Sequence, residues 1–252
     1  MKVNTALQKM RNGEAAYGYS LGLGSVYVAE QVSRTGIDFC FIDTQHGSWG
    51  QESVGLALLA ITAGGSVPMA RVARNDYTLI GRMLDEGAMG IIIPMVDTAE
   101  QAKAAADACR VPPTGNRSWG WGGATRLGAN YSEEINDQVF VGVQLESMES
   151  VENAEAIMST PGVDGCWVGP ADLALSIGIH PSKQFEDERH IRALEKVVEA
   201  CNNTGKIPGF AAFTPKDAKM RYEQGFRFLT AGSDSGFLIE GALDGMTLLG
   251  LR

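Results

Sequence analysis

Eight short apolar runs recur along the chain and alternate with segments of helical character. The runs are rich in Ile, Val and Phe and are mostly apolar on both faces, as the strands of a parallel sheet are. We predict strands over residues 16–23, 38–43, 67–72, 90–95, 139–145, 165–169, 207–212 and 226–231. We predict helices over residues 25–35, 51–63, 76–86, 98–109, 148–159, 186–204, 215–224 and 235–249, with a further short helix before the first strand. Eight β/α units in 252 residues are the size of a (β/α)8 TIM barrel, and we predict one such domain over residues 1–252.

Two segments depart from this alternation. Residues 110–138 form a long glycine-rich insertion with two tryptophans, and a long loop of this kind serves either as a subunit contact or as a substrate lid. Residues 235–249 form an apolar C-terminal helix that needs cover, either from its own barrel or from another subunit. A doubly wound open sheet is the alternative fold. Because no G-x-G-x-x-G follows a predicted strand, we disfavour a dinucleotide-binding fold.

Composition restricts the partners of the chain. A net charge of −9 argues against nucleic acid and against an anionic membrane surface. The four cysteines are scattered and form no C-x-x-C, so we expect reduced thiols and a cytoplasmic location. We find no signal peptide pattern at the N-terminus and no apolar run long enough to span a membrane. The expected partners are therefore small molecules.

Two carboxylates follow neighbouring predicted strands. Glu146 comes after the apolar run that begins at residue 139, and Asp172 comes after the run 165–169, with a helical segment between the two. Parallel βαβ geometry places the carboxyl ends of such strands side by side. Two carboxylates that converge there suit a hard divalent cation. The alternative for either acid alone is a helix N-cap.

Further polar residues stand at the ends of two other predicted strands. Asp43 precedes His46 by three residues and could hold its imidazole by a hydrogen bond, whereas the alternative is a capping aspartate beside a loop histidine. Arg71 interrupts an apolar strand, and a buried arginine needs an anionic partner. That partner could be a substrate, or it could be Asp85 or Glu86 in a structural pair.

These residue types favour the chemistry of an enolate. A divalent ion can chelate a 2-oxo acid and make the adjacent C–H acidic, while a base takes the proton and a cation stabilises the enolate oxygen. The rival mechanism is a Schiff base, which needs a lysine at the active face. None of the eight lysines stands at the carboxyl end of a predicted strand, which favours the metal.

The chain resembles the HpcH/HpaI aldolase family of metal-dependent class II pyruvate aldolases, over nearly its whole length from Gly18 to the C-terminal helix. The resemblance rests on the motifs IDTQHG, PMARVARND, RMLDEGAMGIIIPMV, VPPTGNRS, QLES and VGPADLALSIG. It implies a (β/α)8 barrel and often a hexamer, a trimer of dimers, in which C-terminal helices are exchanged between subunits. It also implies a reversible cleavage of 4-hydroxy-2-oxo acids to pyruvate, or hydroxypyruvate, and an aldehyde.

The same resemblance assigns roles at the site. It makes Glu146 and Asp172 the ligands of a divalent metal cation, which would be Mg, Mn or Co. It makes Arg71 the cation that stabilises the enolate, and His46, paired with Asp43, the base or proton shuttle. The remaining implied contacts are Gln144 at the keto oxygen, the backbone of Gly169, Pro170, Ala171 and Leu173 at the substrate carboxylate, and Asp85 from a neighbouring subunit at the aldehyde end.

Two positions differ from the family pattern. Gln45 stands where many relatives have Glu, which removes a charge beside the expected base. The loop with Trp121 looks particular to this chain, and we expect it to shape the aldehyde pocket. Two other functions stay open: a CoA-ester lyase of the citryl-CoA or malyl-CoA type, and a non-catalytic 2-oxo-acid binding protein.

Overall fold

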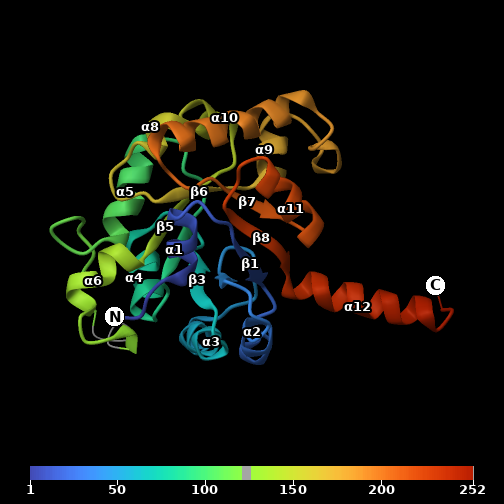
Figure 1. The fold of residues 1–252 in the computed structure, drawn as a ribbon, viewed down its shortest axis with the longest axis horizontal. Coiled ribbons are helices and arrows are strands. Elements are labelled where there is room, and N and C mark those ends of the chain that lie inside the picture. Colours follow the sequence, from blue (N-terminus) through green and yellow to red (C-terminus); the bar gives the residue numbers. More distant parts are fainter. Residues whose placement is uncertain (121–125, 252) are drawn as a thin grey trace.

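The computed structural model describes residues 1–120 and 126–251, and within this part eight parallel strands close into a barrel in the order β1 to β8 (Figure 1). The strands are β1 (Ala16–Leu21), β2 (Phe39–Asp43), β3 (Val67–Arg71), β4 (Gly90–Ile93), β5 (Phe140–Leu145), β6 (Gly165–Val168), β7 (Gly209–Ala212) and β8 (Phe228–Ser233). Each strand pairs with the next one, and β8 returns to β1. The predicted (β/α)8 barrel is confirmed.

Helices alternate with the strands along the chain, and most of them lie around the outer face of this barrel (Figure 1). They are α1 (Thr5–Arg11), α2 (Val26–Ser33), α3 (Gln51–Gly64), α4 (Tyr77–Asp85), α5 (Ala99–Cys109), α6 (Tyr131–Gln138), α7 (Met148–Glu152), α8 (Ala154–Met158), α9 (Pro170–Ser176), α10 (Glu188–Thr204), α11 (Pro215–Glu223) and α12 (Asp234–Leu248), with a short 3-10 turn at Pro181–Lys183. None of the described helices combines the length and the apolar character that a membrane span requires.

Three details of the helix prediction were wrong. Helix α9 was not among the predicted helices. The helix predicted over residues 148–159 is divided at Asn153, because this side chain donates a hydrogen bond of 2.8 Å to the Asp97 carbonyl and the chain turns there. The insertion over residues 110–138 is not a plain loop, since α6 occupies its last eight residues.

Aromatic side chains fill the amino end of the barrel. The ring of Phe228 lies 4.7 Å from that of Phe39 and 4.6 Å from that of Phe140. A Cβ on Gly18 would lie 2.2 Å from the Phe39 ring, so this strand position needs glycine. Helix α1 closes the same end, where Asn4 donates a hydrogen bond of 2.8 Å to the Met89 carbonyl. The carboxyl ends of the strands are therefore left as the open, polar end of the barrel.

Helix α12 extends away from the barrel (Figure 1). Asp234 at its start is buried, whereas Leu238 is 65% exposed and Leu248 is 90% exposed. Only the first turn packs on its own barrel, where the Phe237 ring lies 4.7 Å from that of Tyr19, so the barrel does not cover the rest of the helix.

Candidate active site

The predicted polar residues meet at the carboxyl end of the barrel. Asp43 and Arg71 are the last residues of β2 and β3, and the strand register places them opposite each other. Gln144 lies near the end of β5, and Glu146 follows that strand directly. Four side chains at the carboxyl ends of β2, β3 and β5 therefore face one region of the barrel.

Arg71 and Asp43 form a buried ion pair. The arginine Nε lies 2.9 Å from one carboxylate oxygen of Asp43, and its Nη2 lies 2.5 Å from the other. Only 9% of Arg71 and 6% of Asp43 are exposed, so each neutralises a charge that would be costly to bury alone. The third nitrogen, Nη1, is 3.5 Å from Gln144 Oε1. This two-pronged geometry fixes the guanidinium while leaving N–H groups available for a ligand.

The structural partners that the sequence offered for Arg71 were wrong. Asp85 instead accepts a hydrogen bond of 2.7 Å from Arg117, and Glu86 pairs with Arg82 at 3.4 Å. Asp85 ends α4, which runs from the carboxyl end of β3 to the amino end of β4, so it lies away from the site of its own chain. Its assignment to a neighbouring subunit stays a prediction.

His46 lies at the rim of the site and is exposed. Asp43 accepts hydrogen bonds from the main-chain N–H groups of Gln45 and His46, at 3.0 and 3.3 Å. Among the described residues the His46 imidazole has no hydrogen-bond partner, so the expected bond between Asp43 and the imidazole is not formed. Asp43 therefore shapes the turn that carries His46. The side-chain oxygen of Gln45 is buried and lacks a partner in the same part of the chain.

Glu146 is a buried carboxylate with an unusual pKa. It is 4% exposed, and its oxygens accept hydrogen bonds from the Met95 N–H, at 2.9 Å, and from the Gln144 side-chain amide. Burial raises its pKa from 4.5 to about 7, and the negative charge of Asp172 adds to the rise. The Met95 N–H, Arg71 and the Gln144 amide oppose the rise. The two acids are therefore close enough to repel each other.

Asp172 is exposed and lies in the first turn of α9. Neither acid is a helix N-cap, because Ser147 caps α7 and Gly169 caps α9. The alternative that the sequence left open for each acid alone was therefore wrong. Both acids are left free to act on a ligand.

The start of α9 lies against the Gln144 and Glu146 side chains. A Cβ on Gly169 would be 2.8 Å from both Gln144 Nε2 and Glu146 Oε2, so a larger residue there would displace the ends of these two buried side chains. The other residues predicted to contact the substrate carboxylate, Pro170, Ala171 and Leu173, belong to the same first turn of the helix. Trp121, the last predicted contact, lies outside the described residues.

Two functional neighbours were missed at the sequence level. Trp167 projects into the barrel from β6, opposite Gln144 in register, and its ring lies 5.3 Å from the Arg71 guanidinium. Its indole nitrogen is buried and has no hydrogen-bond partner among the described residues. His190 of α10 is fully buried, and its Nε2 lies 3.0 Å from the Pro170 carbonyl at the start of α9. Alternation along β6 could have pointed to Trp167, whereas no sequence signal pointed to His190.

The residues present fit a divalent cation. Glu146 and Asp172 provide two hard oxygen donors, and they lie close enough together for the charge of Asp172 to raise the pKa of Glu146 further, after the larger effect of burial. Within residues 1–120 and 126–251, no group of three or more His, Cys, Asp or Glu side chains is arranged to hold a metal. Magnesium needs no such group, because it is usually held by one or two carboxylates together with water and substrate oxygens.

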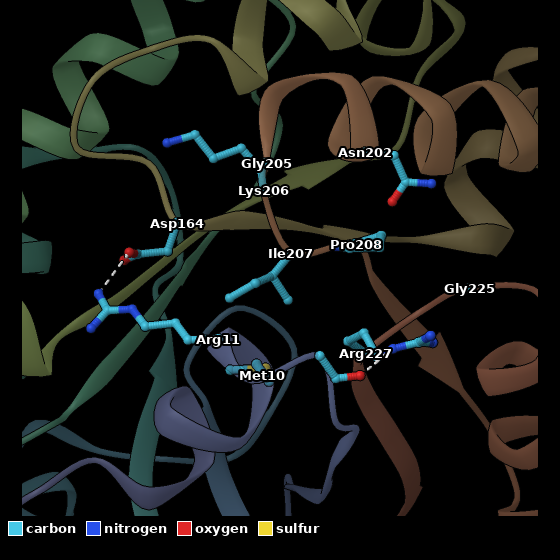
Figure 2. Close-up of a pocket in the computed structure, with 11 residues that line it drawn as sticks. Met10, Arg11, Asp164, Asn202, Gly205, Lys206, Ile207, Pro208, Gly225 and Arg227 are labelled. Carbon is cyan, nitrogen blue, oxygen red and sulfur yellow. Dashed lines mark hydrogen bonds and ion pairs between the residues drawn. The ribbon is translucent and has the colours of Figure 1, made fainter.

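A cavity of about 420 Å³ lies at the opposite end of the barrel, between the end of α1 and the loops before β6, β7 and β8 (Figure 2). Arg11, Lys206 and Arg227 border it, and each donates a hydrogen bond to a main-chain carbonyl. Arg11 also pairs with Asp164, as Figure 2 shows. These basic groups hold loops and helix ends together, so we assign this cavity to the scaffold.

Comparisons with known proteins agree with this geometry. The family model described as HpcH/HpaI aldolase/citrate lyase matches residues 19–241. A hydroxypyruvate/pyruvate aldolase of Chromohalobacter salexigens is 36% identical over 242 residues, which cover 92% of each chain. A 2-keto-3-deoxy-L-rhamnonate aldolase of Klebsiella pneumoniae is 36% identical over 236 residues, which cover 92% of this chain and 87% of the relative. The crystal structure of an HpcH/HpaI aldolase/citrate lyase family protein from Burkholderia cenocepacia superposes with a TM-score of 0.90 at 32% identity, covering 98% of this chain and 99% of the other.

Proposed function

Since this chain belongs to the HpcH/HpaI aldolase/citrate lyase family, we propose that it is a divalent-metal-dependent aldolase that reversibly cleaves 4-hydroxy-2-oxo acids to pyruvate, or hydroxypyruvate, and an aldehyde. The observation that carries the proposal is the buried carboxylate of Glu146, with its raised pKa, beside Asp172 and the Arg71–Asp43 pair at the carboxyl end of the barrel. The names of the relatives, a hydroxypyruvate/pyruvate aldolase and a 2-keto-3-deoxy-L-rhamnonate aldolase, support the same reaction class.

Glu146 and Asp172 would hold the cation. When bound, a divalent ion polarises the keto group of a 2-oxo acid and makes the neighbouring C–H acidic. Because hard oxygen donors suit Mg and Mn as well as Co, we propose one of these three ions. Gln144 donates to Glu146 and so orients this carboxylate. The tight fit of Gly169 keeps the first turn of α9 close to both groups.

Arg71 would stabilise the negative charge that develops on the substrate oxygen. Asp43 holds the guanidinium from one side and Trp167 lies against its face, so its position is set before substrate binds. Such preorganised donors act strongly in a buried site, because they need no reorganisation during the reaction. The site thus supplies a fixed cation where an enolate oxygen forms.

His46 would move the proton. It stands on the turn that Asp43 fixes, at the exposed rim, from which it can exchange protons with solvent. Histidine is the side chain that most often transfers a proton in enzyme active sites. Its role as base or shuttle rests on the family resemblance together with this position.

Exchange of solvent deuterium into the methyl group of pyruvate tests the proposal. We expect exchange in the presence of Mg2+ or Mn2+, and its loss after chelation or in Glu146→Ala and Asp172→Asn. Glu199→Gln, which changes an exposed acid on α10, is the matched control and should exchange normally. Exchange that persists in the chelated protein, or in Glu146→Ala, excludes the proposed metal chemistry. Absence of exchange in the metal-loaded wild type indicates a passive binding protein.

We also propose that the enzyme works as a homo-oligomer, a hexamer built as a trimer of dimers, in which α12 is exchanged between subunits. The exposed apolar side chains of α12, such as Leu238 and Leu248, support this assembly. In such an assembly Asp85, held by Arg117, would reach the aldehyde end of a neighbouring site. Light scattering of the full chain and of a chain ending at Ser233 tests it. We expect the truncated chain to form an oligomer with fewer subunits. An oligomer of unchanged size contradicts the exchange of α12 between subunits.

A further inference from the structure

Met95 has a strained backbone at the edge of the site. Its φ is +55°, and it is the one residue other than glycine with a positive φ in the described part of the chain. L-amino acids with bulky side chains avoid this region, because the Cβ crowds the following carbonyl oxygen. Such conformations persist where the surroundings enforce them, and they are concentrated at functional sites.

Two hydrogen bonds enforce this conformation. The Met95 N–H donates to Glu146 Oε1 at 2.9 Å, and the N–H of the next residue, Val96, donates to the Gln144 carbonyl at 3.3 Å. Val96 is fully buried, so the chain enters the wall of the barrel directly after Met95. The turn that follows β4 is therefore hydrogen-bonded to Gln144 of β5 and to Glu146, which comes directly after β5.

The Met95 side chain stays outside this network. It is 55% exposed, although its main-chain nitrogen lies within hydrogen-bond distance of the proposed metal ligand. The exposed side chain therefore belongs to a residue whose main chain adjoins the place where a 2-oxo acid would be held. Two other large apolar side chains are exposed just past the carboxyl ends of their strands: Leu23 after β1, at 41%, and Phe213 after β7, at 58%. Three exposed apolar side chains therefore lie at the same end of the barrel as the polar residues of the site.

We propose that Met95 is a specificity-determining residue for the aldehyde half of the reaction, and that it favours acceptor aldehydes with an aliphatic or aromatic substituent over polyhydroxylated ones. The inference rests on the aldolase function proposed above. An unbranched thioether adapts to apolar groups of different shapes, which suits a wall rather than a fitted pocket. A polyhydroxylated aldehyde would lose hydrogen bonds to water against this wall without receiving others.

The first test replaces the side chain by a polar one of similar length. In Met95→Gln, the ratio of kcat/KM for pentanal to kcat/KM for glyceraldehyde should fall about tenfold, the effect of about one methylene in an apolar contact. Deuterium exchange into pyruvate, which involves no aldehyde, is measured in the same variant, so that a change in the ratio is separated from any change in enolate formation. Met220→Gln, an exposed methionine on α11 that is 42% exposed, is the matched control and should leave the ratio unchanged.

The second test separates backbone from side chain. Met95→Gly keeps the N–H and removes both the strain and the thioether, so we expect the ratio to fall as in Met95→Gln while Tm rises by about 2–4 °C. An unchanged ratio in both variants, with exchange intact, overturns the inference and leaves the aldolase function standing. Lack of exchange in the metal-loaded wild type overturns the aldolase function itself.

Discussion

Replacement of Glu146 by glutamine should stabilise the metal-free protein at alkaline pH. Burial, and then the charge of Asp172, raise the pKa of Glu146 from 4.5 to about 7. A carboxyl group whose pKa is higher in the folded than in the unfolded protein contributes stability that is complete below pH 4.5 and is lost as the pH rises through 7. The difference corresponds to about 3 kcal/mol of unfolding free energy at pH 8, or a Tm lower by about 6–12 °C in a chain of this size.

The assay is thermal unfolding in chelator at several pH values between 5 and 8. Wild-type Tm should fall relative to Glu146→Gln across this range, and Glu199→Gln should follow the wild type. The variant also alters the hydrogen bond with Gln144, but that effect is the same at each pH and does not change the slope. Since a cation binds the ionised carboxylate, added Mg2+ should restore Tm in the wild type and not in Glu146→Gln. Parallel pH profiles of wild type and Glu146→Gln would refute the reasoning.

Three further predictions concern the neighbours of this carboxylate. Arg71→Ala leaves Asp43 buried without a partner and should lower the free energy of unfolding in urea by about 3–5 kcal/mol. The double variant with Asp43→Ala should lose less unfolding free energy than the two single variants together. Additive losses contradict the ion pair. Trp167→Leu should lower kcat about tenfold with little change in KM, because the contact of the ring with Arg71 is worth about 0.5–2 kcal/mol. Trp167→Phe keeps an aromatic ring and should retain most of the rate. Equal losses of kcat in both variants contradict a positioning role for the ring. Burial lowers the pKa of His190 from 6.5, so its contribution to stability is complete above pH 6.5 and is lost as the pH falls through the lowered pKa. His190→Gln can still donate a hydrogen bond to Pro170 and should unfold at a lower pH than wild type when unfolding is followed by circular dichroism. An unchanged midpoint of acid unfolding argues against a buried neutral histidine.

The fold could be predicted from the sequence because each strand carries its own signal. Strands buried on both faces appear as continuous apolar runs, and all eight runs became barrel strands within a few residues of their predicted ends. The break at Asn153 and the helix α6 could not be predicted in the same way. The first depends on a hydrogen bond to Asp97, which is 56 residues away in the chain, and the second lies in a segment with a weak apolar pattern.

The site could be predicted only as a list of residues. That Glu146 and Arg71 stand at the carboxyl ends of strands follows from their place after apolar runs. The pair between Arg71 and Asp43 does not follow, because it depends on the register of β2 against β3. The left-handed backbone of Met95 is equally hidden, since it arises from bonds to a strand 51 residues further along the chain. Such features belong to the assembled barrel and to no local pattern.

The charges of the site explain why these parts belong together. Asp43 and Arg71 neutralise each other, which leaves Glu146 and Asp172 as two carboxylates without a matching cation. One divalent ion would bring this group to neutrality and lower the pKa of Glu146, whereas the protein alone keeps that carboxyl group partly protonated near pH 7. A 2-oxo acid then adds one negative charge next to the remaining N–H groups of Arg71. The proposed metal would therefore neutralise the two carboxylates, and Arg71 would bind the negative charge of the substrate. Removal of the Asp172 carboxylate should weaken metal binding, whereas removal of the Arg71 guanidinium should weaken substrate turnover.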